Sequence, residues 1–254
     1  MQTLQALARR VRLTCVFYLV LLWLGAMLLL GNLACILLIP APRSLREPFL
    51  QRMISGTFRL FLAGCAAGGI MRLDLTAIDQ VNRQRGLVLV ANHPSMIDVF
   101  LVISRARQAV CLMKDSLTAN VFLALGARLA GYISNRHTDQ MIRRAASTVA
   151  HGGMLLVFPE STRTEQQPVS AFQPGAALIA KRAKAPMQII FLETNSQYLA
   201  KGWPIWRAPP FPMMFKARLG ECVMPVSSVR ETTHELQQRF ERALHLSINP
   251  DLQL

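Results

Sequence analysis

The sequence predicts an α/β domain with a mixed, mostly parallel sheet flanked by helices, preceded by a membrane-associated segment of two helices. Leu13 to Ile39 is an apolar run of 27 residues without a charge. Beyond Arg72, short β-rich apolar runs alternate with helical stretches, which is the pattern of α/β domains. A chain of 254 residues is long enough for one domain with an appendage. We therefore divide the chain into a two-helix segment, 1–72, and an α/β domain, 73–254.

The first apolar run exceeds the ~20 residues that a helix needs to cross a bilayer. Arginines precede it as in a secretory signal, but a signal core has only about 7–15 apolar residues, and no small-x-small cleavage site follows. Pro40-Ala41-Pro42 ends the run, and a second, amphipathic helix is expected from Arg46 to Met71. Because arginines flank the first run on both sides, two topologies stay open. They are a single span and a hairpin that dips into one leaflet, with a bend near Gly25 or Gly31.

The α/β part is predicted to contain five strands and four helices. The strands are expected at Leu87–Val90, Ala109–Met113, Met154–Phe158, Met187–Leu192 and Phe215–Leu219. The helices are expected at Met96–Ser104, Thr138–Ala150, Gly175–Lys184 and Val229–Leu246.

The charge balance favours an anionic partner. Net charge is +14, and 23 of the 28 cations are arginine. Nucleic acid is not expected as a partner, because the arginines are scattered, with no run of five and no aromatic interleaving. A surface apposed to anionic membrane lipids fits the apolar amino end better, and it also suits an anionic substrate or an acidic carrier protein.

The five cysteines and five histidines form no pattern of a metal site. The cysteines form no C-x-x-C pair, and three of them lie in apolar amino-terminal stretches. Small buried thiols in a reducing compartment are therefore expected, with no metal.

A first chemical motif follows the strand Leu87–Val90, where Asn92, His93 and Asp98 lie in the sequence Asn-His-Pro-Ser-Met-Ile-Asp. Ser95 is the expected N-cap of the next helix. His93 and Asp98 would point about 140° apart in one regular helix, so they can meet only if His93 lies in the corner before it. Such a pair is a candidate general base with its orienting carboxylate.

A second motif, Phe-Pro-Glu-Ser-Thr-Arg from Phe158 to Arg163, follows another predicted strand. In a parallel sheet its polar side chains emerge at the same carboxyl edge as His93, where ligands of open α/β sheets gather. The guanidinium of Arg163 suits a phosphate group. A structural ion pair between Glu160 and Arg163 is the alternative.

Together the motifs resemble the lysophosphatidate (1-acylglycerol-3-phosphate) acyltransferase family of the glycerolipid acyltransferase superfamily. The family has N-H-x4-D followed by F-P-E-G-T-R, and here Ser161 replaces the glycine. The resemblance implies a glycerol-phosphate acyltransferase-like fold with 73–254 as the catalytic domain. It also implies that His93 and Asp98 are catalytic. The substrate-binding residues that it implies are Asn92, Lys114, Arg136, Glu160, Thr162 and Arg163.

The resemblance further implies a membrane-bound O-acyltransferase of phospholipid biosynthesis. The donor would be an acyl thioester, on coenzyme A or acyl carrier protein, used as a co-substrate without another cofactor. The acceptor would be the hydroxyl of a lysolipid, above all 1-acyl-sn-glycerol-3-phosphate, giving phosphatidic acid. We expect the bacterial inner membrane as its location, with the catalytic domain at the cytoplasmic face.

Three other functions stay open from the sequence. Because Ser161 departs from the family pattern, the acceptor could instead be a lyso-ornithine lipid or a specialised lipid or polyene. The His93–Asp98 pair would also serve a membrane-bound hydrolase. A non-catalytic basic protein that binds membranes or nucleic acid is the third alternative.

Overall fold

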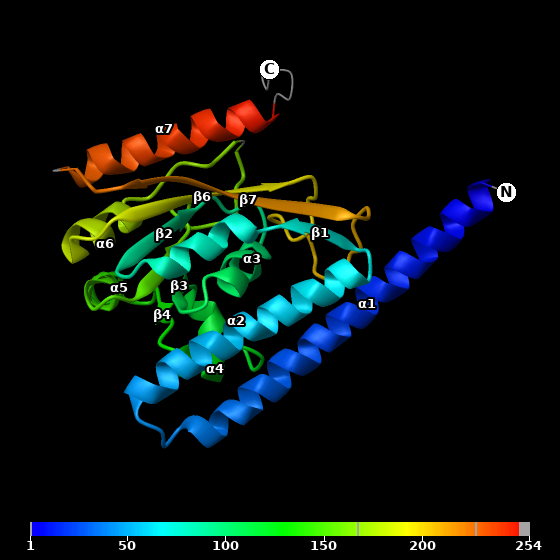
Figure 1. The fold of residues 1–254 in the computed structure, drawn as a ribbon, viewed down its shortest axis with the longest axis horizontal. Coiled ribbons are helices and arrows are strands. Elements are labelled where there is room, and N and C mark those ends of the chain that lie inside the picture. Colours follow the sequence, from blue (N-terminus) through cyan, green and yellow to red (C-terminus); the bar gives the residue numbers. More distant parts are fainter. Residues whose placement is uncertain (1, 167, 227, 249–254) are drawn as a thin grey trace.

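The computed structural model describes residues 2–166, 168–226 and 228–248, and these form a seven-stranded sheet with helices on both faces (Figure 1). The strands are β1 (Met71–Asp74), β2 (Leu87–Ala91), β3 (Ala109–Met113), β4 (Ile133–Ser134), β5 (Met154–Val157), β6 (Met187–Thr194) and β7 (Met213–Val223). The α-helices are α1 (Gln2–Ala34), α2 (Arg43–Ala67), α3 (Asp98–Arg105), α4 (Ala124–Leu129), α5 (Thr138–Ala150), α6 (Gly175–Ala183) and α7 (Val229–Ile248). Short 3-10 turns are η1 (Cys35–Leu38), η2 (Thr76–Arg83) and η3 (Asp115–Ala119).

The strand order is β1-β7-β6-β2-β5-β3-β4. Every neighbouring pair is parallel except β6 and β7, which run antiparallel. The predicted mixed, mostly parallel sheet is therefore confirmed. The parallel run β6-β2-β5-β3-β4 brings the carboxyl ends of five strands to one edge, and both sequence motifs begin at that edge.

Alternate residues of β2 face two separate apolar cores, because successive side chains of a strand point to opposite faces. Leu87 and Leu89 belong to the core under α1, α2 and α3. Val88 and Val90 belong to the core under α5, α6 and α7. All four are fully buried, which explains why this strand is a continuous apolar run.

All five predicted strands and four predicted helices are present, with ends shifted by a few residues. Two strands were not predicted. β1 has four residues, two of them charged, and β4 has only two. Segments this short carry no measurable periodicity, and they pair only because the rest of the sheet supplies an edge.

Helix α1 runs without interruption for 33 residues, so the bend expected near Gly25 or Gly31 is absent. The chain instead turns back through η1 and Pro42, and α2 packs against α1 as a hairpin. At Gly64 the two helices approach so closely that an added Cβ would lie 2.4 Å from the Trp23 ring. Glycine at this position lets the helices touch.

The α1–α2 hairpin shares a core with the α/β domain. The Phe58 ring of α2 stacks on the Phe100 ring of α3, with centroids 4.2 Å apart. The Ser104 carbonyl at the end of α3 accepts hydrogen bonds from Ser55 and Arg59 of α2. Residue 72 therefore marks a change in sequence pattern, while the two parts pack as one body.

Candidate active site

Asn92 ties the end of β2 to β6. Its side-chain amide donates to the Leu192 carbonyl at 2.9 Å, and its amide oxygen accepts the Leu192 N–H at 2.8 Å. The residue is buried, and both ends of its amide are occupied. Asn92 therefore holds the corner that carries His93 in place, and the substrate contact predicted for it from the sequence stays a prediction.

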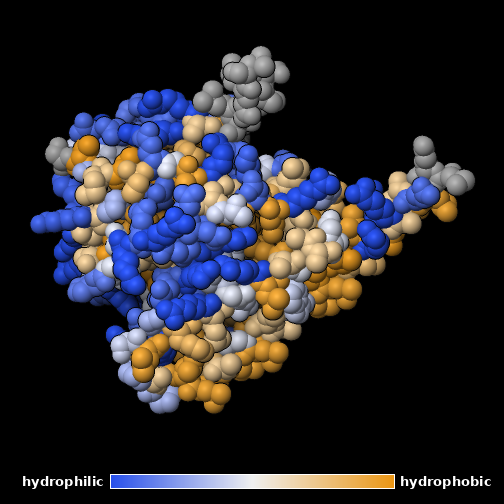
Figure 2. All heavy atoms as spheres, viewed as in Figure 1, coloured by the Kyte–Doolittle hydropathy of each residue, from blue (hydrophilic) through white to orange (hydrophobic). Residues whose placement is uncertain are grey.

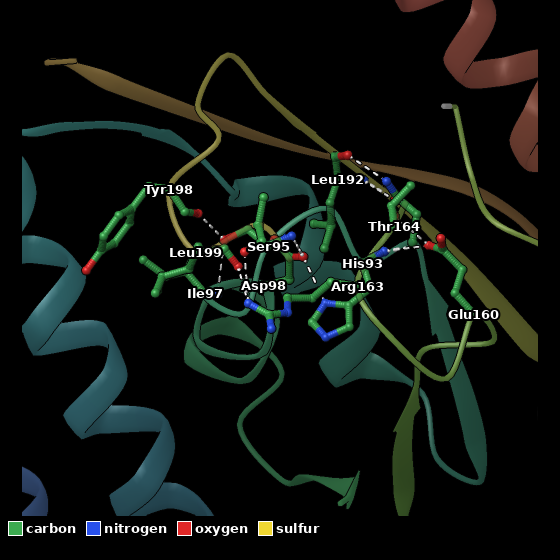
Figure 3. Close-up of polar contacts among 12 residues, drawn as sticks. His93, Ser95, Ile97, Asp98, Glu160, Arg163, Thr164, Leu192, Tyr198 and Leu199 are labelled. Atoms are coloured by element: carbon green, nitrogen blue, oxygen red, sulfur yellow. Dashed lines mark hydrogen bonds and ion pairs between the residues drawn. The ribbon is translucent and has the colours of Figure 1, made fainter. Parts of the chain in front are cut away.

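His93 and Asp98 form a direct pair, as the sequence predicted. His93 Nδ1 lies 3.0 Å from Asp98 Oδ2 (Figure 3). The imidazole also stacks on the Phe158 ring, with ring centroids 4.1 Å apart. His93 lies in the corner after β2, and Asp98 is the first residue of α3. A carboxylate only accepts hydrogen bonds, so it places the hydrogen on Nδ1 and leaves the Nε2 lone pair available.

Asp98 is completely buried, and its oxygens have unequal surroundings. Oδ2 accepts the Ser95 N–H at 2.7 Å in addition to the contact with His93. Oδ1 is buried without a hydrogen-bond partner among the described residues. Burial raises the pKa of the Asp98 carboxyl above its ordinary value, and the hydrogen bond and charge of His93 act in the opposite direction. His93 is thus the main compensation for this buried acid.

Ser95 supports the corner and is not the N-cap that we predicted. Helix α3 begins at Asp98, and Ile97 occupies the capping position. The Ser95 hydroxyl donates to the Tyr198 carbonyl at 2.6 Å and is fully buried. It links the His93 corner to the loop after β6.

Glu160 is a buried acceptor that fixes the backbone around His93. Oε1 accepts the His93 N–H and the Thr164 hydroxyl, both at 2.9 Å, and Oε2 accepts the Ser170 N–H at 2.8 Å. The Thr164 N–H also donates to the His93 carbonyl at 2.8 Å. The structure therefore gives Glu160 a supporting place between the two motifs, and its predicted substrate contact stays a prediction.

Arg163 lies at the same edge, half-buried. Its Nη1 donates to the carbonyls of Leu199 and Ala200 at 3.0 and 2.9 Å (Figure 3). No ion pair joins it to Glu160 in the described part of the chain, so the alternative of a structural pair is wrong. Nη1 donates to the loop after β6, and Nε and Nη2 have no hydrogen-bond acceptor among the described residues.

The remaining predicted residues, Lys114, Arg136 and Thr162, are exposed. Lys114 directly follows β3, and Arg136 lies two residues beyond β4. Strands β3 and β4 are parallel neighbours with Met113 beside Ser134. Both cations therefore emerge at the carboxyl edge of the sheet, where the two motifs begin. A positively charged rim therefore borders the side of the site next to β5.

Comparison with known proteins finds similarity to acyltransferases. The family model described as Acyltransferase matches residues 72–192, which contain both motifs. This part of the chain is similar to the acyltransferase family. A Caenorhabditis elegans protein named as a 1-acyl-sn-glycerol-3-phosphate acyltransferase, acl-1, is 26% identical over 179 residues. These residues cover 67% of this chain and 66% of that relative.

The likeness in fold extends beyond the residues of the family match. A crystal structure of the 1-acyl-sn-glycerophosphate acyltransferase PlsC from Thermotoga maritima superposes with a TM-score of 0.67. The alignment covers 96% of this chain and 97% of that one at 18% identity. At this identity the likeness shows the fold alone, and it includes the region of the amino-terminal hairpin.

A groove of about 950 Å³ opens beside the acyltransferase motifs, between the ends of β2 and β6. Asn92, Pro94 and Thr164 form part of its wall. Within the described residues, no group of three histidine, cysteine or acidic side chains has the arrangement of a metal site. The two motifs and the neighbouring strands bring an imidazole, a carboxylate and several cations to this edge.

At Ser161, where the chain departs from the acyltransferase motif, the backbone has a conformation that favours glycine. Its φ is +58°, in the left-handed region where a side chain costs about 1 kcal/mol. Replacing Ser161 with glycine is expected to raise the midpoint of thermal unfolding by up to about 3 °C. Ser161→Ala keeps the strained Cβ and is the matched control. Equal midpoints for the two variants would contradict the explanation.

Proposed function

We propose that this protein is a membrane-bound O-acyltransferase that moves a fatty acyl group from a thioester to the hydroxyl of 1-acyl-sn-glycerol-3-phosphate. The product is phosphatidic acid. The observation that carries the proposal is the His93–Asp98 pair at the carboxyl edge of the sheet, within the family match. The name of the Caenorhabditis elegans relative supports this acceptor.

His93 acts as the general base. Its Nε2 takes the proton of the acceptor hydroxyl as that oxygen attacks the thioester carbonyl. The tetrahedral intermediate then collapses, the carbon–sulfur bond breaks, and the leaving thiolate receives the proton from the imidazolium. Asp98 holds the ring in the required tautomer and stabilises the imidazolium. A thioester is already activated, so no covalent intermediate on the enzyme and no further cofactor are needed.

The cations at the carboxyl edge of the sheet bind the acceptor's phosphate. Arg163 offers the guanidinium atoms that the loop after β6 leaves free, and Lys114 and Arg136 extend the positive rim. Thr162 is exposed beside them and offers a hydroxyl. The donor is acyl-coenzyme A or acyl carrier protein, and both carry the negative charge that this rim attracts.

The substrates dictate a membrane location. Lifting an acyl chain into water costs ~0.8 kcal/mol per CH₂, so a sixteen-carbon chain costs more than ~10 kcal/mol. A site that opens at the bilayer surface avoids this barrier. Among the described residues, one helical stretch, Leu4–Leu38, is long and apolar enough to cross a membrane. We place the protein at the cytoplasmic face of a bacterial inner membrane.

Helix α1 lies along the membrane surface and does not cross it. Phe17 packs against Tyr198 and Phe211, and Asn32 bonds to the Val121 carbonyl and the Gly126 N–H. Phe17 and Asn32 are separated by about 22 Å along the helix. A helix that touches the catalytic domain over this length cannot traverse a core of about 30 Å while that domain stays in water.

The outer face of α1 is the membrane contact. Figure 2 shows apolar side chains gathered along α1 and around the hairpin turn, away from the polar α/β body. Large exposed apolar residues recur at helical spacing along this face. They are Leu4, Leu7, Val11, Leu19, Leu22, Leu30 and Leu33, and Leu37 of η1 continues the series.

Substituting this face should release the protein from membranes without unfolding it. In the triple variant Leu19→Asn, Leu22→Asn, Leu30→Asn, each leucine removed from lipid weakens binding by about 1.5–3 kcal/mol. We expect most of the variant to stay in the supernatant when sedimented with phosphatidylcholine vesicles, with an unchanged unfolding midpoint. The control is Leu178→Asn, Met224→Asn, which alters exposed residues elsewhere. Full sedimentation of the α1 variant would refute this attachment.

The function is tested by mass spectrometry of the products. The purified protein is offered acyl-coenzyme A and acyl carrier protein with lysophosphatidate, glycerol 3-phosphate and a lyso-ornithine lipid in neutral detergent. Phosphatidic acid as the main product supports the proposal. Free fatty acid formed without an acceptor would indicate a hydrolase, and preference for another acceptor would correct the substrate. No product, with salt-dependent binding only, would indicate a non-catalytic protein.

A further inference from the structure

A second groove lies away from the catalytic motifs, at the amino-terminal end of α1. It has a volume of about 650 Å³ and runs between the first turns of α1 and the loop from Trp203 to Phe211. None of the residues that line it belongs to either sequence motif. The mechanism described above therefore makes no use of this groove.

The groove is cationic. Arg9, Arg10 and Arg207 line it, all three are exposed, and no acidic residue contributes to its described wall. None of these guanidinium groups pairs with a carboxylate in the described part of the chain. Arg105, by contrast, pairs with Asp79. Three unneutralised guanidinium groups around one hollow form a site for an anion such as phosphate.

One side of the groove is held in place before any ligand binds. The guanidinium of Arg207 lies 4.5 Å from the centre of the Trp203 ring. The indole N–H of Trp203 in turn donates to the Arg207 carbonyl at 2.9 Å. This mutual contact restricts both side chains, and it lowers the ordering cost when an anion binds.

The surroundings of the groove identify the anion's source. Leu4, Leu7 and Val11, on the same turns of α1, are exposed. On the facing loop, Ile205 is exposed and Trp206 is 69% exposed. Figure 2 shows the hydrophilic side chains near the amino end of α1 directly beside apolar ones. Arginine next to apolar side chains and tryptophan is the arrangement found at membrane interfaces.

We propose that this groove binds the phosphate of an anionic bilayer phospholipid, at a site separate from the reacting acceptor. The proposal rests on the membrane attachment argued above and adds a lipid class to it. The apolar side chains around the groove enter the acyl region, and the three arginines receive the headgroup. Bound lipid would fix the amino end of α1 and the loop from Trp203 to Phe211 at the bilayer surface.

The test compares binding of the full chain to neutral and anionic vesicles. Vesicles of phosphatidylcholine alone are compared with vesicles containing 30% phosphatidylglycerol, using Arg9→Gln, Arg10→Gln, Arg207→Gln. Each arginine near an anionic surface raises the affinity for that surface about fivefold. The triple variant should therefore bind anionic vesicles about 100-fold less tightly. Its binding to neutral vesicles should be unchanged. The matched control is Arg143→Gln, Arg144→Gln, Arg182→Gln, which removes the same charge from α5 and α6.

Equal losses in the two triple variants would overturn the proposal, because general attraction by net charge would then explain the binding. If the loss of the Arg207 contact lowers thermal stability, Arg9→Gln, Arg10→Gln replaces the triple, with an expected loss of about 25-fold. Competition separates the sources of phosphate. Free inorganic phosphate at 10 mM should not displace the protein from anionic vesicles, and displacement would point to a soluble phosphate ligand.

Activity in neutral detergent micelles separates this groove from the acceptor site. The groove variant should keep its KM for lysophosphatidate within about twofold. A tenfold higher KM would place the acceptor in the groove and overturn the proposal. The vesicle measurement needs no turnover, so a failure of the proposed function would leave it interpretable.

Discussion

Replacing His93 with alanine should lower kcat for acyl transfer at least about 10³-fold while leaving the protein folded, because a positioned general base contributes about 10²–10⁴-fold. The variant removes the imidazole, whose Nδ1 is engaged by Asp98 and whose Nε2 would accept the proton, so the acceptor hydroxyl then has no base. Loss of the stacking on Phe158 should cost only about 1–2 kcal/mol of stability. The measurement is single-turnover transfer of a labelled acyl group to lysophosphatidate, with thermal unfolding recorded in parallel.

Two further variants separate catalysis from loss of structure. His151→Ala removes an exposed histidine at the end of α5, beyond the opposite edge of the sheet, and should keep full activity. Asp98→Asn preserves the shape of the buried side chain but no longer fixes the imidazole tautomer. Its kcat for acyl transfer should be about 10²–10⁴-fold lower than that of wild type. If His93→Ala keeps more than a tenth of wild-type kcat, His93 is not the base.

The acid side of the pH profile should depend on the same pair. Burial raises the pKa of the Asp98 carboxyl, so this group takes up a proton at a higher pH than an exposed aspartate does. Protonation of Asp98 removes the negative charge that orients and stabilises the imidazole. Turnover should therefore fall as pH decreases.

The sequence predicted the elements that have a clear period and the motifs that follow them. β2 and β5 are apolar runs, and each precedes a polar motif, so the meeting of His93 with Asp98 at the carboxyl edge follows from strand direction alone. Helix ends were less accurate. Ser95 has the residue type of an N-cap, but its hydroxyl bonds to Tyr198, 103 residues away, and the helix begins later.

The supporting roles of polar residues could not be predicted, because they depend on contacts that are distant in the sequence. Asn92 bonds to Leu192, which is 100 residues away, and Glu160 accepts the N–H of His93, 67 residues away. A carboxylate in a conspicuous motif has the same pattern in the sequence whether it binds substrate or holds the backbone. Burial distinguishes the two, and burial comes from the assembled sheet.

The core that the α1–α2 hairpin shares with the α/β domain also could not be predicted from the sequence. The apolar composition of α1 and α2 indicates lipid, and one face of each does lie on the outside. Their other faces carry Phe17, Phe58 and Phe61 into the core of the α/β domain. Deleting the hairpin would therefore expose that core. Membrane attachment has to be tested by surface substitutions.

Glu160→Ala is expected to be the most destabilising change in the candidate site. It leaves three donors without their acceptor: the N–H groups of His93 and Ser170, and the Thr164 hydroxyl. Each unsatisfied donor costs about 1–3 kcal/mol when water does not replace the acceptor. A loss of about 3–5 kcal/mol should lower the midpoint of thermal unfolding by about 10 °C.

Glu160→Ala should also lower kcat about 100-fold below its unfolding temperature, because the backbone of His93 loses its anchor and small misplacements of a base are costly. The KM for lysophosphatidate should stay within about threefold. Glu160→Gln keeps one oxygen but places its amide NH₂ group against a donor. Its kcat and its unfolding midpoint should therefore lie between those of Glu160→Ala and wild type. Glu221→Ala removes an exposed carboxylate paired with Arg239 and should change neither quantity. A Glu160→Ala protein with wild-type stability and a tenfold higher KM would show that this carboxylate touches the acceptor, because only a substrate contact weakens binding without loosening the fold.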